Sequence, residues 1–154
     1  MDFSKLEVAT KEVRKLARFT FGENVRIPGV EGRLWIDVVC ADRKNKKYFN
    51  GMLKSDRRRQ RRIQRGNLRT EDLDEQFERS LVLFPLHVCK AWGVVNDGEY
   101  VEAPYTADEC EAVLRKIAQS DYESVDDLID FATNTANFTE DVDAGGDDGG
   151  LGKN

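Results

Sequence analysis

The sequence has few of the residues that build metal centres and disulfide frameworks: it contains three cysteines and one histidine in 154 residues. Cys40, Cys89 and Cys110 are odd in number, widely spaced and flanked by apolar residues, so we expect reduced thiols in the core instead of disulfides. With His87 they could supply four zinc ligands, but structural zinc sites usually bring cysteines in close pairs. The spacing therefore predicts no metal and no other cofactor.

Long apolar runs are also missing. No run reaches the roughly 18 to 20 residues that cross a bilayer. The first twenty residues alternate charged and apolar groups and contain no signal-peptide core. We therefore expect a soluble, intracellular protein. The hydrophobic fraction of 40% is compatible with one folded domain of this length.

A catalytic constellation is a further absence. Acidic pairs such as Asp126-Asp127 and Glu109-x-Glu111 have no base, nucleophile or glycine-rich loop near them in sequence. Charges of this kind are better explained as groups that stabilise the N-termini of helices. The sequence thus predicts that the protein is not an enzyme.

Charge, by contrast, is abundant and unevenly distributed. Residues 43–69 carry twelve Lys or Arg against one acid, Asp56, whereas residues 70–154 carry five basic and twenty-one acidic side chains. The modest net charge of −5 hides two opposed electrostatic fields that could steer a partner or a second copy of the chain. This pattern indicates a binding protein.

The basic residues concentrate in one stretch, which is the candidate partner-binding site: Lys54, Arg57, Arg58, Arg59, Arg61, Arg62 and Arg65. Arginine forks match phosphate oxygens, so nucleic acid is one possible partner. Against it, no aromatic residue is interleaved in this stretch and the chain as a whole is acidic. An acidic protein surface or a neighbouring subunit is the favoured partner, and a solvated face without function is the third interpretation.

The first half of the chain is predicted to contain helices and strands. Residues 3–19 place apolar residues at helical spacing among Lys and Arg, which predicts an N-terminal helix. Residues 25–28 and 33–40 are rich in β-favouring residues around a turn-rich linker and predict a hairpin or small sheet. The basic segment 43–65 is predicted as a helix with a narrow apolar face, ended by Gly66-Asn67.

The hydrophobic centre of the chain is predicted to be a helix that begins near Thr70. Apolar residues recur from Leu73 to Val95 at steps of three or four, as on a buried helix. Thr70 can cap the first turn, where acidic residues are favoured by the helix dipole. Pro85 predicts a kink or a break near Leu83.

Turn and capping signals divide the remaining residues. Asn96-Asp97-Gly98 predicts a tight turn. Thr106 to Glu109 form a capping box that opens one helix, and Ser124 to Asp127 open another in a related way. Residues 139–154 are too polar and glycine-rich to bury a core, so they are predicted to form a disordered acidic tail.

These elements predict an α+β fold. The expected architecture is a single, mostly helical domain over residues 1–138, with a small N-terminal β-hairpin or sheet. It would contain the basic helix 43–65 and a helical core over residues 70–138, followed by the tail.

The order of elements carries a family resemblance over roughly residues 20–138. An apolar helix ends at Trp92-Gly93, the Asp97-Gly98 turn and Pro104-Tyr105 precede a capped helix, and a last helix closes on Ala136-Asn137-Phe138. In this order the chain resembles the tail assembly chaperones of long-tailed bacteriophages and prophages. The early strand and the Arg-rich helix that follows it are similar to that family as well.

The resemblance implies a chaperone that binds the tape measure protein and tail-tube subunits during tail assembly. Such a protein would act in the cytoplasm of the bacterial host and be absent from the mature virion. Two alternatives remain: a nucleic-acid-binding regulator that uses the Arg-rich helix, and a tail-completion or connector protein of the virion. The opposed charges also predict a homo-oligomer, and no membrane partner is expected.

Overall fold

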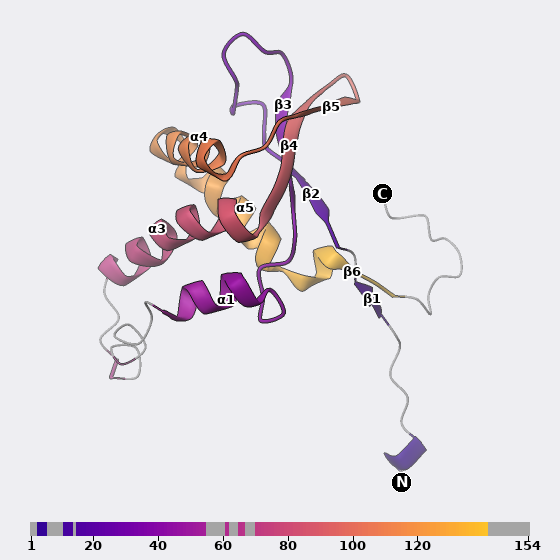
Figure 1. Ribbon diagram of the computed structural model, residues 1–154, viewed down its shortest axis with the longest axis vertical. Helices are drawn as coiled ribbons and strands as arrows, with labels where there is room; N and C mark the ends of the chain where they lie inside the picture. The colour runs from indigo at the N-terminus through magenta and orange to yellow at the C-terminus, as the bar shows by residue number, and fades with distance from the viewer. Residues whose placement is uncertain are drawn as a thin grey trace.

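The computed structural model describes residues 3–5, 11–13, 15–54, 61, 65–66 and 70–141. Its centre is an antiparallel sheet of four strands in the order β2-β3-β4-β5 (Figure 1). These strands are β2 (Ala17–Thr20), β3 (Arg33–Val38), β4 (Cys89–Asn96) and β5 (Glu99–Ala103). A separate pair joins β1 (Lys11–Val13) to β6 (Thr139–Asp141).

Helices gather on one side of the sheet in Figure 1. They are α1 (Lys46–Leu53), α3 (Thr70–His87), α4 (Ala107–Ser120) and α5 (Tyr122–Thr133). Two short 3-10 helices, η1 (Phe3–Lys5) and η2 (Thr135–Phe138), lie near the beginning and the end of the described residues. Helices on one face of an antiparallel sheet confirm the predicted α+β class.

The two faces of the sheet differ in how they are covered. Leu34, Ile36 and Val38 alternate along β3 and join the buried core on the helix side. Trp35 points to the opposite face, where the Arg18 guanidinium lies 3.8 Å from the centre of its ring. Arg18 also pairs with Asp37, with Nε 2.7 Å from Oδ1. Trp35 is therefore only 1% exposed on a face that the helices do not cover.

The N-terminal helix predicted over residues 3–19 is wrong. The described part of this segment forms η1, β1 and β2, and β2 pairs antiparallel with β3. Phe19 packs edge to face on Phe21 with ring centres 5.0 Å apart, and lies 5.4 Å from the Phe131 ring. The Phe131 contact and the pairing with β3 join residues far apart in sequence and outweigh the local helical spacing, because burial and strand pairing commonly override weak propensity.

The first predicted strand, residues 25–28, is also wrong, whereas the second is confirmed as β3. Residues 25–28 belong to the loop between β2 and β3, and Gly29 and Gly32 adopt positive φ there. The sheet partner of β3 lies further upstream, since β2 takes that position. Local composition could not distinguish these two partners.

The helix predicted to continue towards Val95 ends earlier. Helix α3 runs as one helix through Pro85 to His87, so of the predicted kink or break near Leu83 the break does not occur, and β4 follows from Cys89. Strand β4 pairs with β3 on one side and β5 on the other. A central strand can be apolar on both faces, so its residues do not show the simple alternation that distinguishes a strand from a helix.

The predicted turn and the two predicted helix starts can each be compared with the structure. The turn at Asn96-Asp97-Gly98 is confirmed as the tight connection between β4 and β5. Thr106 caps α4 as predicted, because its Oγ1 accepts a hydrogen bond from the Glu109 amide at 3.2 Å. Helix α5 begins at Tyr122, capped by Asp121, two residues before the predicted opening at Ser124.

The predicted disordered tail from residue 139 is wrong for its first three residues. Thr139–Asp141 form β6, which pairs with Lys11–Val13 of β1. Composition could not reveal this pairing because the partner strand lies at the opposite end of the chain. Residues 142–154 lie outside the described part of the structure.

Candidate functional site

The predicted basic site is described only in part. Helix α1 covers Lys46–Leu53, and Lys54 follows it as an exposed C-cap residue. Arg61 and Arg65 are exposed. The other predicted residues, Arg57, Arg58, Arg59 and Arg62, lie outside the described residues. Partner binding by this basic segment stays a prediction.

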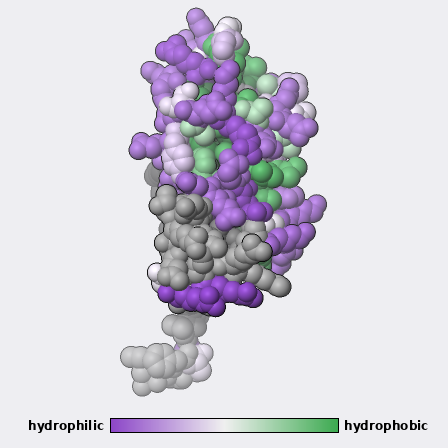
Figure 2. Space-filling view, turned by 90° about the vertical axis from the view of Figure 1, so that its left-hand side faces the viewer, coloured by the Kyte–Doolittle hydropathy of each residue, from purple (hydrophilic) through white to green (hydrophobic). Residues whose placement is uncertain are grey.

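A different surface emerges between the sheet and α4, where a cavity of about 700 Å³ opens. Its walls come from the loop before β3 (Ile27 and Val30), from the β4–β5 hairpin (Val94 and Val101) and from α4 (Val113). Among the described residues that line it, only Glu109 is charged. We call this feature the apolar groove. Figure 2 shows the side of the molecule that carries α4, with hydrophobic residues exposed between hydrophilic ones.

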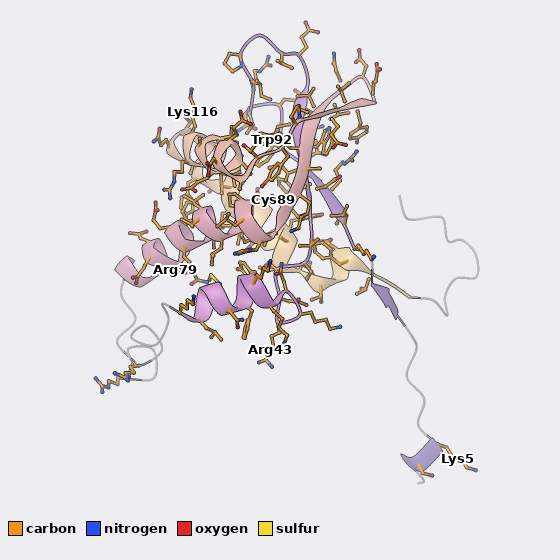
Figure 3. All side chains as sticks on the ribbon, in the orientation of Figure 1. Lys5, Arg43, Arg79, Cys89, Trp92 and Lys116 are labelled. Atoms are coloured by element: carbon orange, nitrogen blue, oxygen red, sulfur yellow. The ribbon has the colours of Figure 1, made fainter. Side chains whose placement is uncertain are left out.

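Two hydrogen bonds fix the position of the connection between β5 and α4, which borders the groove. The Trp92 indole Nε1 donates to the Pro104 carbonyl oxygen at 2.7 Å, and the Tyr105 hydroxyl donates to the Pro85 carbonyl oxygen at 2.6 Å. The Trp92 and Tyr105 rings meet edge to face with centres 5.5 Å apart. These contacts tie the end of β5 to both β4 and α3. Figure 3 shows Trp92 on β4 and Lys116 on α4, the two elements that face each other here.

Strand β5 forms one border of the groove and lies at the edge of the sheet. All five of its residues are exposed. Val101 is 54% exposed, and Val30 across the groove is 44% exposed. Exposed apolar side chains that cluster beside an apolar cavity are typical of an interaction site.

Charge is distributed unevenly around the groove. Between Lys90 and Arg115 the chain has six acidic and no basic residues, so the hairpin and the start of α4 are strongly acidic. An adjoining cavity of about 340 Å³ shares Ile27 and Val113 with the groove and is bordered by Arg26, Lys116 and Asp121. The groove thus has an acidic side at β5 and charges of both signs beyond its other side.

All three cysteines and the single histidine lie within the described residues. Cys89 and Cys110 are free, buried thiols, as predicted, and Cys40 is a partly exposed free thiol. The hydrogen bond between Cys89 and Cys110 raises the pKa of Cys89 and lowers that of Cys110. Burial lowers the pKa of His87, and Lys47 and Lys90 lower it further. Within the described ranges, no three His, Cys, Asp or Glu side chains are arranged to hold a metal ion.

Sequence comparison places the chain in a group of phage-related proteins. A family model described as YdaY prophage protein matches residues 43–146. The chain belongs to this prophage family. The match includes the β4–β5 hairpin and α4, and therefore two of the three walls of the groove. No curated protein and no solved structure matches the chain.

The family match bears on the origin of the protein and not on its activity. A phage or prophage origin is established by the family match, whereas the family description gives no activity. Among the described residues, no helix is long and apolar enough to cross a membrane. The groove was missed from sequence because its walls come from three separate segments. The signals that could have indicated it are the run of acidic residues after Lys90 and the apolar residues of β5.

Proposed function

We propose that this prophage protein is a tail assembly chaperone, which binds the tape measure protein and tail-tube subunits in the host cytoplasm and is not retained in the virion. The observation that supports this most is the apolar groove bordered by the exposed edge strand β5. Apolar surface of this kind takes up apolar segments of another chain. Membership of a prophage family is consistent with the same role.

The geometry suits transient holding of a client protein. Val30 is 44% exposed and Val101 is 54% exposed, so burying the rest of each side chain contributes about half of the roughly 1.5–3 kcal/mol that a fully exposed side chain gives. A few contacts of that size give a complex that forms in the cell and still dissociates when the tail assembles. This is binding without covalent chemistry, in keeping with the proposal that the protein is not an enzyme.

The basic segment supplies a second contact in this proposal. Lys54, Arg61 and Arg65 are exposed, and long cationic side chains of this kind attract an acidic partner surface over several ångströms. Exposed charges mainly accelerate association. In this proposal the groove therefore provides most of the binding affinity, and the basic segment increases the rate at which the client associates.

Co-expression tests the proposed function. The tape measure protein encoded in the same prophage should be insoluble when it is produced alone and soluble when this chain is produced with it. The two should also copurify, because the client stays bound until tail-tube subunits are available. A tape measure protein whose solubility does not depend on this chain, and that does not copurify with it, would contradict the chaperone role.

The basic segment also favours a second candidate, a nucleic-acid-binding regulator. Charge reversal of Arg58, Arg59, Arg61 and Arg62 to Glu separates the two functions. A regulator should bind a specific duplex at physiological salt roughly 10³-fold or more above non-specific DNA, and the variant should lose this binding. A chaperone should bind duplex DNA only weakly at that salt, and the variant should instead lower the soluble fraction of the tape measure protein, because it associates with this client more slowly.

A further inference from the structure

We propose that the client segment binds by β-strand addition to β5. An extended segment would pair with the open edge of the sheet, with apolar side chains in the groove and Lys or Arg on its other face. The identity of the client rests on the proposed function, whereas the binding surface and its chemistry are derived from β5, the groove and their charges.

The hairpin determines which backbone groups of β5 are available. Asp97 and Gly98 have φ of 52° and 80°, so they form a two-residue turn in which Asn96 and Glu99 are a hydrogen-bonded pair. Antiparallel pairs alternate between bonded and non-bonded, so Val101 is bonded to its partner Val94 on β4. Consistent with this, the Val101 carbonyl oxygen faces β4, only 1.9 Å from where a Cβ on Gly93 would lie.

The same alternation directs the remaining backbone groups outward. Tyr100 and Glu102 occupy the non-bonded pairs with Val95 and Gly93. Their N–H and C=O groups therefore point away from β4, towards the open edge of the sheet. An added strand can pair with both residues without breaking any bond between β4 and β5. These are the groups that strand-addition sites use for affinity.

The side chains of β5 alternate in the same way and offer two different faces. Val101 and Ala103 border the apolar groove. Tyr100 lies on the opposite face, where its ring is 6.2 Å from the Trp35 ring. Successive side chains of an added strand also alternate. One set would enter the groove beside Val101, and the other would lie beside Tyr100 and Glu102.

Charge identifies the second set as basic. The run of acidic residues between Lys90 and Arg115 includes Glu102 on this face. Arg18, a nearby cation, is paired with Asp37 and also lies 4.9 Å from the centre of the Tyr100 ring. Glu102 is exposed at the edge of the sheet, and a Lys or Arg of the client opposite it would form a cross-strand ion pair.

The same charges disfavour a second copy as the occupant. Pairing two β5 strands would bring two acidic hairpins together, each with Glu99 and Glu102 on the pairing strand. Charged side chains on edge strands commonly prevent self-pairing. Pro104 directly after β5 also limits the length of any β5–β5 ladder. A basic partner strand avoids the charge repulsion.

Amide hydrogen exchange of the full-length protein with a synthetic peptide tests the proposal. The probe is a capped peptide of alternating lysine and valine, and its control replaces every lysine with glutamate. The lysine peptide should bind, more weakly at high salt, and the glutamate peptide should bind at least about tenfold less tightly. On binding, the Tyr100 and Glu102 amides should gain protection, whereas the Val101 amide, already bonded to β4, should change little.

Two results would overturn the proposal. Protection that appears along α4 and not at Tyr100 and Glu102 would show that the groove takes a helix. Alternating protection that is already present in the free protein and increases with its concentration would assign β5 to a second copy. The test is independent of the chaperone assay: the amide pattern can fail while the tape measure protein stays soluble, and the pattern can appear although the tape measure protein is not a client.

Discussion

At the scale of single residues, Gly93 determines how closely β4, β5 and Trp35 approach one another. A Cβ at this position would lie 1.9 Å from the Val101 carbonyl oxygen and 2.6 Å from Trp35 Cζ2. Both distances are far below a van der Waals contact, and the first involves backbone. The glycine is therefore required for close approach of the strand to its neighbours and not for an unusual backbone angle.

Gly93→Ala should destabilise the fold by about 1–3 kcal/mol, because the methyl group forces β5 or Trp35 to move. Chemical denaturation measures this change. Gly98→Ala is the matched control: it has positive φ of 80° and no atom within 4 Å of the added Cβ, so only backbone strain of about 1 kcal/mol is expected. A Gly93→Ala variant as stable as the wild type would show that the sheet is less tightly packed here.

At the scale of elements, local signals predicted what local chemistry determines. The Asp97-Gly98 turn and the Thr106 cap depend on a few neighbouring residues, and both were predictable. The strand character of residues 17–20 depends on pairing with β3, and that of β6 depends on β1. Such long-range partners leave no local pattern, which is why these strands and the groove beside β5 could not be predicted.

Helix α5 provides a pH-dependent test at this scale. The Asp121 side chain accepts hydrogen bonds from the Ser124 hydroxyl at 2.6 Å and from the Ser124 amide at 3.3 Å, and also from Asn24. Hydrogen bonding by Ser124 lowers the pKa of Asp121 below its ordinary value of 3.8. The folded state therefore favours the charged form, and the cap contributes most above the unfolded pKa.

Asp121→Ala should lower the melting temperature at neutral pH, since it removes the cap of α5. The difference from the wild type should shrink as pH falls through the lowered pKa, because protonation weakens the wild-type cap. Melting curves from neutral pH to below about pH 4 measure this. A difference that stays constant over that range would mean that the Asp121 charge makes no contribution.

At the scale of the whole molecule, the basic segment and the apolar groove with its acidic border come from different parts of the chain. The basic segment covers residues 43–65, and the acidic hairpin borders the groove on β5. The sequence predicted the separation of charge and the need for a partner, but it assigned binding to the basic segment alone. The groove became visible only when the loop before β3, β5 and α4 were brought together by the fold. In our account the two surfaces contact different parts of one client.

The central claim is that the groove holds the tape measure protein, and a pair of matched double variants tests it most directly. Val30→Lys with Val101→Lys places charge in the groove, whereas Val82→Lys with Leu86→Lys adds the same charge at exposed apolar residues of α3 outside it. Both variants should fold, because all four side chains are exposed. Each is co-expressed with the tape measure protein, and the soluble fraction of that protein is measured. We predict that the groove variant loses most of this fraction and that the α3 variant keeps it. Equal solubility with the two variants would contradict the account.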